Sequence, residues 1–535
     1  MRDGFGSAAE REKEGIEDGR KQTVARQGQY GDVRLGTLLE GAGVRSGTTP
    51  AADLRIQQVT NDSRKVRPGA LFVAIHGEAT DGNLFVNDAA AHGASAVLSA
   101  AAAPAEWKHA IPWIEVREPR KALAIAAANF YGRPANALRL VGVTGTNGKT
   151  TTASLIDSII QASGAKTGLF GTIAYRTPLG DKPAPNTTPE SVDLQSFFAE
   201  IRDAGGSYAT MEASSHALAM DRLWGCHFAV AVFTNLTRDH IDFHKTFENY
   251  FAAKGKLFAG TGAGAPDVAV VNTDDEWGRK LVAGAKRTLT YGLQNGTDLK
   301  AKRFQLSFNG LSFTAQTPNG PIQVESPLVG RINVYNTLAA IAAGIGLGFS
   351  NDVIEAGIRN LHAVAGRFQR IDQGQPFLAV VDYAHTDDAL ENLIRTAREL
   401  ITKGRIITMF GCGGSRDRTK RPIMGETAGR LSDLSILTSD NPRQEDPLKI
   451  ISDIVVGMQK SGGKYLIEAD REKAIKLAIE EARAGDIVLL AGKGHEDYQI
   501  FADHTIHFDD REVARKALEE RGYAETPLGG GGFGA

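Results

Sequence analysis

The stretch 138–152, Leu-Arg-Leu-Val-Gly-Val-Thr-Gly-Thr-Asn-Gly-Lys-Thr-Thr-Thr, constrains the fold of this chain more than any other. Its first part, 138–143, is a short apolar run with the composition of a buried strand. A glycine-rich loop with Gly145, Gly148 and Lys149 follows, and an amphipathic segment begins directly after it. The order strand, glycine-rich loop and helix predicts an α/β domain built around a parallel sheet.

A loop of this kind favours phosphate binding. Backbone N–H groups point at the anion, and the helix dipole favours negative charge at the helix N-terminus. Lys149 would add a positive charge, and the hydroxyl of Thr150 would face Mg²⁺. The loop has two residues between its glycines where the usual P-loop has four. The alternative is a turn that binds nothing, which a lysine followed by three threonines disfavours. The expected phosphate-binding set is Gly145, Thr146, Asn147, Gly148, Lys149, Thr150 and Thr151.

Length and composition indicate an ordinary globular enzyme. The chain has 535 residues, enough for roughly three domains, and 42% of them are hydrophobic. A net charge of −2 gives no reason to expect nucleic acid or a membrane as a partner. Cys226 and Cys412 are too few and too far apart for a disulfide framework or a zinc site. We find no apolar run of membrane-spanning length and expect no signal peptide, so we expect a cytoplasmic protein, and a monomer.

The pattern along the chain predicts three α/β domains and two tails. We expect a disordered tail at 1–32, a small N-terminal domain at 33–137, a central domain at 138–365, a Rossmann-like C-terminal domain at 366–525 and a glycine-rich tail at 526–535. In the N-terminal domain, strands are predicted at 71–75 and 96–98, a helix at 121–129 and a polar loop at 61–69.

Apolar runs separated by helical stretches predict a mostly parallel central sheet with helices on both faces. Its further strands are expected at 169–170, 208–212, 228–233 and 268–271, and two turns at Asn309-Gly310 and Asn319-Gly320 predict antiparallel hairpins near 304–325. Strands of the C-terminal domain are expected at 378–382, 406–410, 434–437 and 487–491. Ligands of such sheets bind beyond the carboxyl ends of the strands, where Glu212, Asn235 and Asn272 fall.

Three residues of the central domain suggest metal-assisted chemistry. Glu212 ends an apolar strand, where a carboxylate suits Mg²⁺, directly or through water. His240 lies in the segment 237–244, which holds two acids and two histidines, although a single histidine is often structural. Lys254 lies in an alanine-rich helical context, and a desolvated lysine can be neutral and add CO₂ to become a carbamate. From the residues alone, a solvated helix lysine is the more common case.

These segments, with others in the same order, resemble the ATP-dependent Mur ligases of peptidoglycan precursor synthesis. The resemblance covers about residues 34–523. Its motifs are Gly145-Thr-Asn-Gly-Lys-Thr-Thr151, Met211-Glu-Ala-Ser-Ser-His216, Asn235-Leu-Thr-Arg-Asp-His-Ile-Asp242, Ala253-Lys254, Asn333-Val-Tyr-Asn336, Gly366-Arg367 and Asp382-Tyr-Ala-His-Thr386. It implies a ligase that uses ATP and Mg²⁺ to join an amino acid to the D-Glu carboxylate of UDP-MurNAc-L-Ala-D-Glu through an acyl phosphate.

The resemblance also implies a role for each matching residue. Lys149, His240 and Lys254 would be catalytic, and Thr150, Glu212, His240 and the carbamate of Lys254 would hold the metal. Asn336, Arg367 and Asp382 would contact ATP together with the glycine-rich loop. The UDP-linked substrate would contact Asn61, Ser63, Glu78, Ala79, Thr80, Asn186, Thr187, Thr188, Ser214 and Arg222. Two departures from the family pattern are Ala365, where proline is usual, and Met220, where some members carry glutamine.

The motif Asp440-Asn-Pro-Arg443 predicts the amino acid. Taken alone it is a turn, since Asp, Asn and Pro favour turns. In the resembled family this form accompanies members that add meso-diaminopimelate, whose distal carboxylate an arginine fork would bind. The expected diaminopimelate-binding set is Arg416, Asp440, Asn441, Pro442, Arg443, Gly492 and Glu496.

Other functions stay open on the sequence. One alternative is a ligase that adds L-lysine, and another is a ligase like folylpolyglutamate synthetase, which shares the loop and the lysine. The N-terminal domain and the Asp382-Tyr-Ala-His stretch argue against the second. A P-loop switch or binding protein without catalysis is disfavoured by the joint presence of Glu212, His240 and Lys254.

Overall fold

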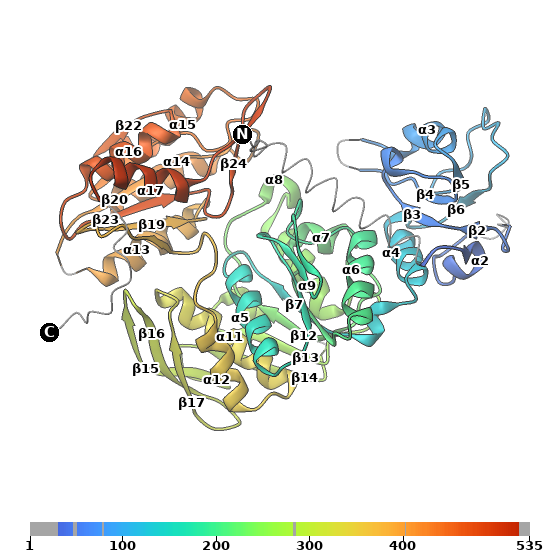
Figure 1. The fold of residues 1–535 in the computed structure, drawn as a ribbon, viewed down its shortest axis with the longest axis horizontal. Helices are drawn as coiled ribbons and strands as arrows, with labels where there is room; N and C mark the ends of the chain where they lie inside the picture. Colours follow the sequence, from blue (N-terminus) through green and yellow to red (C-terminus); the bar gives the residue numbers. More distant parts are fainter. Residues whose placement is uncertain (1–29, 46–50, 78–79, 282–284, 402, 524–535) are drawn as a thin grey trace, which may run out of the picture.

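Three large β-sheets follow one another along the described chain, each with its own helices, and two two-stranded sheets accompany them (Figure 1). The computed structural model describes residues 30–45, 51–77, 80–281, 285–401 and 403–523. The expected tails lie outside the described residues, apart from 30–32 at the end of the first. Within the described ranges, no helix is long and apolar enough to cross a membrane. The α/β fold class expected from the sequence is confirmed.

The first sheet has four parallel strands in sequence order. They are β3 (Gln58–Thr60), β4 (Ala70–Val73), β5 (Ala94–Ser99) and β6 (Trp113–Glu115). Helices α2 (Leu35–Leu38), α3 (Val86–Ala91) and α4 (Pro119–Phe130) accompany it, and β1 (Val33–Arg34) pairs with β2 (Arg55–Ile56). The predicted polar loop at 61–69 contains a short 3₁₀ helix, Ser63–Lys65, whose first turn Asp62 caps by accepting from the N–H of Arg64.

The second sheet has eleven strands in the order β10-β9-β8-β11-β7-β12-β13-β14-β15-β16-β17. Its strands are β7 (Arg139–Thr144), β8 (Thr167–Phe170), β9 (Tyr175–Thr177), β10 (Gly180–Lys182), β11 (Tyr208–Glu212), β12 (Phe228–Phe233), β13 (Val268–Asn272), β14 (Arg287–Gly292), β15 (Leu299–Ser307), β16 (Gly310–Gln316) and β17 (Ile322–Ser326). The strands from β8 to β15 run parallel in that order, and antiparallel strands extend both edges. The turns at Asn309-Gly310 and Asn319-Gly320 join β15, β16 and β17 as predicted.

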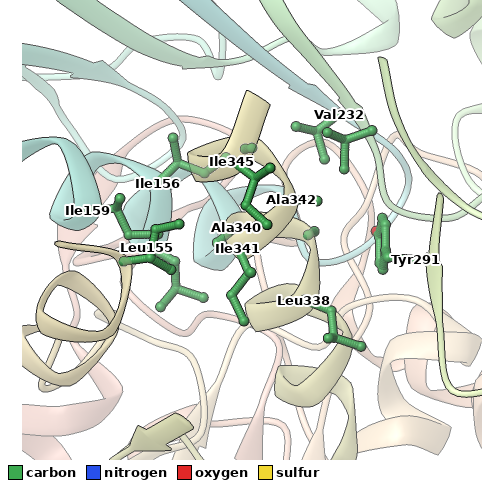
Figure 2. Packing of buried hydrophobic residues seen from close by; sticks show 14 of the residues in the cluster. Leu155, Ile156, Ile159, Val232, Tyr291, Leu338, Ala340, Ile341, Ala342 and Ile345 are labelled. Carbon is green, nitrogen blue, oxygen red and sulfur yellow. The ribbon is translucent and has the colours of Figure 1, made fainter. Parts of the chain in front are cut away.

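Apolar side chains on both faces of the second sheet bury it between helices, as a parallel sheet requires. Val141 and Leu140 on β7 pack into opposite cores. One core includes α5 (Lys149–Ala162), α11 (Arg331–Leu347) and α12 (Asn351–Asn360), and the other includes α6 (Ser191–Asp203) and α9 (Phe247–Ala259). Figure 2 shows α11 packed between Leu155, Ile156 and Ile159 of α5 and the sheet residues Val232 and Tyr291. The helix that follows the glycine-rich loop, α5, therefore packs against α11 and also contacts α12 and β11.

The third sheet has six strands in the order β18-β19-β23-β20-β21-β22, all parallel except β18. They are β18 (Gln369–Ile371), β19 (Leu378–Asp382), β20 (Ile406–Phe410), β21 (Leu434–Leu437), β22 (Tyr465–Ile467) and β23 (Ile487–Ala491). Helices α13 (Asp387–Leu400), α14 (Lys420–Leu431), α15 (Pro447–Ser461), α16 (Arg471–Glu481) and α17 (Asp510–Glu520) surround it, and β24 (Tyr498–Ile500) forms a hairpin with β25 (Thr505–His507). The four predicted strands match β19, β20, β21 and β23.

Candidate active site between the second and third sheets

The loop between β7 and α5 needs glycine at positions 145 and 148 for steric reasons. A Cβ on Gly145 would lie 1.9 Å from Oγ1 of Thr234, and a Cβ on Gly148 would lie 2.4 Å from Oδ1 of Asn336. Both glycines also have positive φ, at 146° and 84°. The shorter spacing between the glycines is thus compatible with a tight loop, which ends at the N-terminus of α5.

Asn235, directly after β12, holds this loop from the neighbouring strand. Its Oδ1 accepts from the backbone N–H of Asn147 at 2.9 Å, and its Nδ2 donates to the carbonyl of Asn147 at 3.1 Å. The Nζ of Lys149 donates to the carbonyls of Gly145 and Thr146 at 3.0 and 2.7 Å. Burial lowers the pKa of Lys149, and the charges of Glu212 and Asp239 oppose that shift. The sequence predicts Asn235 at a strand end, and its role in holding the loop is visible only in the structure.

Glu212 is buried at the end of β11, beside the loop. Its carboxylate accepts from the backbone N–H of Thr172 at 2.9 Å and from the hydroxyl of Thr172 at 3.3 Å. Thr172 was not singled out by sequence, because it follows β8 with no motif of its own. These bonds fix the direction of the carboxylate, which lies on the wall of one pocket with Thr150, His240 and Lys254.

His240 begins the short helix α8 (Ile241–His244) with left-handed backbone, φ 54°. The His240 ring packs edge-on against His216 with centroids 4.7 Å apart. Burial lowers the pKa of His240 to about 3, although neighbouring Asp239 opposes the shift. The imidazole is therefore neutral at physiological pH, which is the form that can bind a metal.

Lys254 on α9 is buried, so the solvated helix lysine favoured by the residues alone is wrong. The reason is tertiary: α9 packs against the glycine-rich loop, and Nζ of Lys254 donates to the carbonyl of Gly145 at 2.7 Å. It also lies 4.4 Å above the centre of the Tyr250 ring. Burial and the charge of Lys149 lower the pKa of Lys254 well below its ordinary value.

The oxygen donors around this pocket suit Mg²⁺. Thr150 brings a hydroxyl and Glu212 a buried carboxylate, and hard oxygen ligands are what Mg²⁺ prefers. No cluster of three or more His, Cys, Asp and Glu side chains suited to a metal occurs among the described residues. A site of this kind matches a cation that takes few protein ligands and shares the rest with a phosphate.

The opposite wall of the pocket comes from the third sheet and from α11. Arg367, just before β18, donates to the hydroxyl of Thr150 at 3.0 Å and stacks 4.7 Å above the ring of Tyr383. Asp382 accepts from the backbone N–H groups of Phe368 and Ala384 at 2.7 and 2.8 Å, while burial raises its pKa. Asn336 also lines this pocket. The expected nucleotide contacts of the three parts therefore meet in one place.

Each large sheet together with its helices forms one body of the molecule. A second contact joins the third body, which contains the third sheet, to the glycine-rich loop. Oδ2 of Asp388, at the start of α13, accepts from Nδ2 of Asn147 at 2.6 Å and from the hydroxyl of Thr237 at 3.3 Å. Arg238 reaches Thr419 and lies 3.8 Å from Asp417. No motif in the sequence marks Asp388, because the partners of a helix N-terminus depend on how two bodies pack.

The residues expected to hold the muramoyl part lie beside Glu212. Thr187 and Ser214 line the pocket. Thr188 donates to the carbonyl of Glu212 at 2.6 Å, and Arg222 donates to the carbonyl of Thr188 at 3.0 Å and lies 3.3 Å from Glu190. The carbonyl of Asn186 accepts from the hydroxyl of Tyr175. Thr188 and Arg222 thus support this wall from behind.

The residues expected to hold the uridine nucleotide lie on the first body, away from this pocket. Asn61 and Ser63 are half-buried at the end of β3 and the start of the 3₁₀ helix. The carbonyl of Thr80 accepts from the N–H of Gly77 at 2.9 Å. Glu78 and Ala79 lie outside the described residues. The first body meets the second where Lys121 lies 4.2 Å above the ring of Trp224.

The residues expected to bind diaminopimelate form a second cluster at the carboxyl ends of β20, β21 and β23. Asn441 donates to Oε2 of Glu496 at 3.0 Å, and the hydroxyl of Tyr383 donates to Oε1 of Glu496 at 3.3 Å. Asp440 packs against Gly492, where a Cβ would lie 3.1 Å from Oδ2 of Asp440. Since Tyr383 also lines the nucleotide pocket, the two sites are adjacent.

Two arginines flank this second cluster. Arg443 has left-handed backbone, φ 53°, a conformation that is costly for arginine and that packing must maintain. Its guanidinium donates to the carbonyl of Gly414 at 3.0 Å. A Cβ on Gly413 would lie 3.0 Å from Nη1 of Arg443 and 3.8 Å from Cγ of Arg416, so both side chains face the same glycine. Pro442, which directly precedes Arg443 in the turn, is buried.

The chain matches three family models that together span most of its length. They are Mur ligase family, catalytic domain, at residues 55–131; Mur ligase middle domain, at 143–344; and Mur ligase, glutamate ligase domain, at 366–494. These ranges coincide with the three sheets and their connections.

Full-length relatives and solved structures agree with these matches. The UDP-N-acetylmuramoyl-L-alanyl-D-glutamate--2,6-diaminopimelate ligase of Solibacter usitatus (strain Ellin6076) is 51% identical over 496 residues, which cover 92% of this chain and 100% of that protein. A solved structure with the same protein name is 34% identical with a TM-score of 0.64 and covers 92% of this chain and 100% of its own. The folylpolyglutamate synthase of Mycobacterium tuberculosis, complexed with ADP and AMPPCP, shares the fold at 15% identity, with a TM-score of 0.57 over 75% of this chain and 95% of its own. The chain therefore belongs to the Mur ligase family.

Proposed function

We propose that this protein is the ATP-dependent ligase that joins meso-diaminopimelate to the D-Glu carboxylate of UDP-MurNAc-L-Ala-D-Glu, in peptidoglycan precursor synthesis. One observation supports this best. A phosphate-binding pocket and a cluster with two arginines and a carboxylate share Tyr383 as a common wall. An acyl phosphate formed in the first would then lie beside an amino acid held in the second. The relatives named for this reaction are similar along their whole length.

The reaction consists of two transfers. An oxygen of the D-Glu carboxylate forms a bond to the γ-phosphorus of ATP as the bond to the bridging oxygen of ADP breaks. The amine of diaminopimelate then attacks the acyl carbon, phosphate leaves, and the ammonium proton passes to water. Lys149 and the N–H groups at the start of α5 stabilise the charge on the transferred phosphoryl group. Arg367, Asn336 and Asp382 hold the nucleotide from the opposite wall.

Mg²⁺ fits beside Thr150, Glu212 and His240, where it would neutralise charge on the phosphates. Lys254 takes part as a carbamate. Its depressed pKa leaves a neutral amine, whose nitrogen forms a bond to CO₂ as a proton is released to water. The product is an anion beside Lys149 that restores charge balance in a buried site. This assignment rests on burial and position, together with the family resemblance.

The UDP-linked substrate is proposed to extend from the pocket to the first body. Thr187, Ser214 and Arg222 lie near the muramoyl dipeptide in this arrangement, and Asn61, Ser63 and Thr80 near the uridine nucleotide. The domains proposed for these tasks are 33–137 for the UDP part, 138–365 for ATP and 366–525 for the amino acid. We also propose that the protein acts in the cytoplasm, where ATP is available, and as a monomer, because the second and third bodies of one chain line the nucleotide pocket together.

L-Lysine is the nearest competing substrate. It lacks the distal carboxylate, so it would leave Arg443 and Arg416 without an anionic partner. None of the hydrogen bonds or ion pairs among the described residues involves the guanidinium of Arg416, which leaves it for such a carboxylate. A folylpolyglutamate-type ligase shares the fold alone.

Phosphate release tests the proposed function. The purified protein is assayed with ATP, Mg²⁺ and UDP-MurNAc-L-Ala-D-Glu, together with a panel of amino acids. We expect phosphate release that requires both the muramoyl substrate and meso-diaminopimelate. Turnover with a folate and glutamate, or no turnover with any amino acid on the muramoyl substrate, would contradict the proposal.

A further inference from the structure

Lys493 lies beneath the amino-acid cluster and is a lysine whose side chain is entirely buried. It follows β23 directly, in the segment Gly492-Lys-Gly-His-Glu496. Its Nζ donates to Oδ1 of Asn441 at 3.2 Å and to the carbonyl of Tyr498. A side chain with no exposed surface cannot touch an amino acid bound above it. Any role in the reaction must therefore act through its neighbours.

The first neighbour is Asn441, whose amide orientation Lys493 fixes. The backbone N–H of Ile500 also donates to Oδ1 of Asn441, at 3.0 Å. An ammonium and a backbone N–H can only donate, so the atom that faces both must be the oxygen. The amide nitrogen must then face the other way, where it donates to Oε2 of Glu496.

The second neighbour is a pair of carboxylates. Nζ of Lys493 lies 3.6 Å from Oε2 of Glu496 and 4.0 Å from Oδ1 of Asp440. Two carboxylates and one ammonium leave one negative charge in this group. That charge matches a single ammonium from a ligand, and without Lys493 the two carboxylates would repel each other in a buried place.

We propose that Lys493 is a positioning residue for the amino-acid substrate: it orients the amide of Asn441 and keeps Glu496 an anion, so that Glu496 can accept the distal ammonium of diaminopimelate. The proposal rests on the function proposed above and deepens it. Lys493 acts by charge and hydrogen bonding on Asn441 and Glu496. Arg443 and Arg416 instead act on the distal carboxylate of diaminopimelate.

The charges around Glu496 agree with this role. Burial raises the pKa of Glu496 and Asp440 raises it further, whereas Lys493 and the bonds from Asn441 and Tyr383 lower it. Burial lowers the pKa of Lys493, as does Arg471, and Asp440, Glu496 and Asp510 oppose that shift. The other titratable neighbour is Tyr498, whose pKa burial raises. Lys493 is therefore the cation that hydrogen-bonds within this group and offsets its carboxylates.

The test is Lys493→Met, which keeps the length of the side chain and removes its charge. We expect kcat/KM for meso-diaminopimelate at pH 7 to fall about 30-fold or more, the usual cost of removing one partner of a buried charge pair. The loss should shrink as pH rises, because one of the two carboxylates then takes up a proton that must leave before the ammonium can bind. The acid limb of the pH profile should move up by about one unit. KM for ATP should stay within about threefold of the wild type.

Two further variants separate charge from packing. Asp440→Asn combined with Lys493→Met again leaves one negative charge, so the acid limb should return towards its wild-type position even where some activity is lost. Lys476→Met, the same change at a half-buried lysine of α16 that pairs with Glu520, should alter neither parameter. Thermal unfolding of each variant shows whether it folds, and the double variant provides the test if the single variant does not.

The outcomes distinguish the role of Lys493 from the proposed function on which it rests. A wild-type protein that fails to use diaminopimelate refutes the proposed function. A wild-type protein that uses it, with Lys493→Met unchanged in kcat/KM or reduced equally at every pH, refutes the role of Lys493. If the acid limb of the pH profile does not return towards its wild-type position in the double variant, the charge argument is refuted as well.

Discussion

Lys254 shows how far a single residue can be understood from its neighbours in sequence. The alanines before it predict a helix, and α9 covers this position. Tyr250, which contacts Lys254, lies one turn earlier on the same helix. The burial of Lys254 could not be predicted, because it also depends on Gly145, which comes from the distant loop after β7. Family resemblance supplied what local pattern could not.

Lys254→Ala tests the carbamate. We expect kcat to fall roughly 100-fold or more, since a charged group that orients the metal and phosphate is lost. A small carboxylic acid such as acetate or formate in the buffer should restore part of the activity by occupying the space left by the carbamate. Lys256→Ala on the same helix is the matched control, because Lys256 pairs with Asp221 at the surface. Full activity in Lys254→Ala would end the assignment.

Arg471 and Asp510 form an ion pair in which neither side chain is exposed. Arg471 also donates to the carbonyls of Ser439 and Ala491, both at 3.0 Å, so it ties together the ends of β21 and β23 where the amino-acid cluster begins. No motif marks this pair in the sequence.

Asp510→Asn should destabilise the protein by about 3–5 kcal/mol, because it leaves a buried guanidinium without its charge partner. Equilibrium urea unfolding followed by circular dichroism measures the change. Glu512→Gln, an exposed position on the same helix, should stay within about 0.5 kcal/mol of the wild type. A similar small change in Asp510→Asn would mean that the pair is not needed for stability.

At the scale of elements, strands were predicted where an apolar run is bounded by turn residues. Such runs form the strands β7, β11, β12 and β13. Glycine at tight turns marks the loop before α5. The short strands β9, β10, β18 and β22, at or next to the sheet edges, were not predicted, because three residues carry too little pattern and pairing with a neighbour defines them. The same holds for the partners of Asp388 and Thr172, which depend on packing between elements.

The junction before β18 gives a prediction about closure of the third body on the nucleotide. Arg367 spans the junction by its bond to Thr150 and its stacking on Tyr383. Arg367→Ala should lower kcat/KM for ATP about 10- to 100-fold, as expected for a hydrogen bond to a charged group. Its thermal unfolding should be unchanged. Arg370→Ala, an exposed arginine three residues on that pairs with Asp372, serves as the control. Unchanged kinetics for ATP would show that this junction does not clamp the nucleotide.

In the molecule as a whole, the nucleotide pocket and the amino-acid cluster are adjacent. The second and third bodies meet at the nucleotide pocket, and Tyr383 links that pocket to the amino-acid cluster. Sequence predicted the strands that carry these residues, and the resemblance predicted that they act together. Neither could give the contacts of Asp388 with Asn147 and Thr237, which arise only when two bodies pack.

We expect the choice between meso-diaminopimelate and other amino acids to depend most on Arg443. Arg443→Ala should reduce kcat/KM for meso-diaminopimelate about 30-fold or more, because the distal carboxylate loses its partner in a partly desolvated site. KM for ATP should change little, since Arg443 does not line the nucleotide pocket. Equal effects on both substrates would point to a structural role for Arg443.

The most direct measurement compares kcat/KM for meso-diaminopimelate and L-lysine on the wild-type protein, with UDP-MurNAc-L-Ala-D-Glu, ATP and Mg²⁺ held saturating. The two amino acids share their chain and differ in the distal carboxylate. A site built for a polar group rejects an analogue that lacks it by roughly 10⁴-fold or more, so we expect a preference of that order for meso-diaminopimelate. Equal or better use of L-lysine would contradict the account.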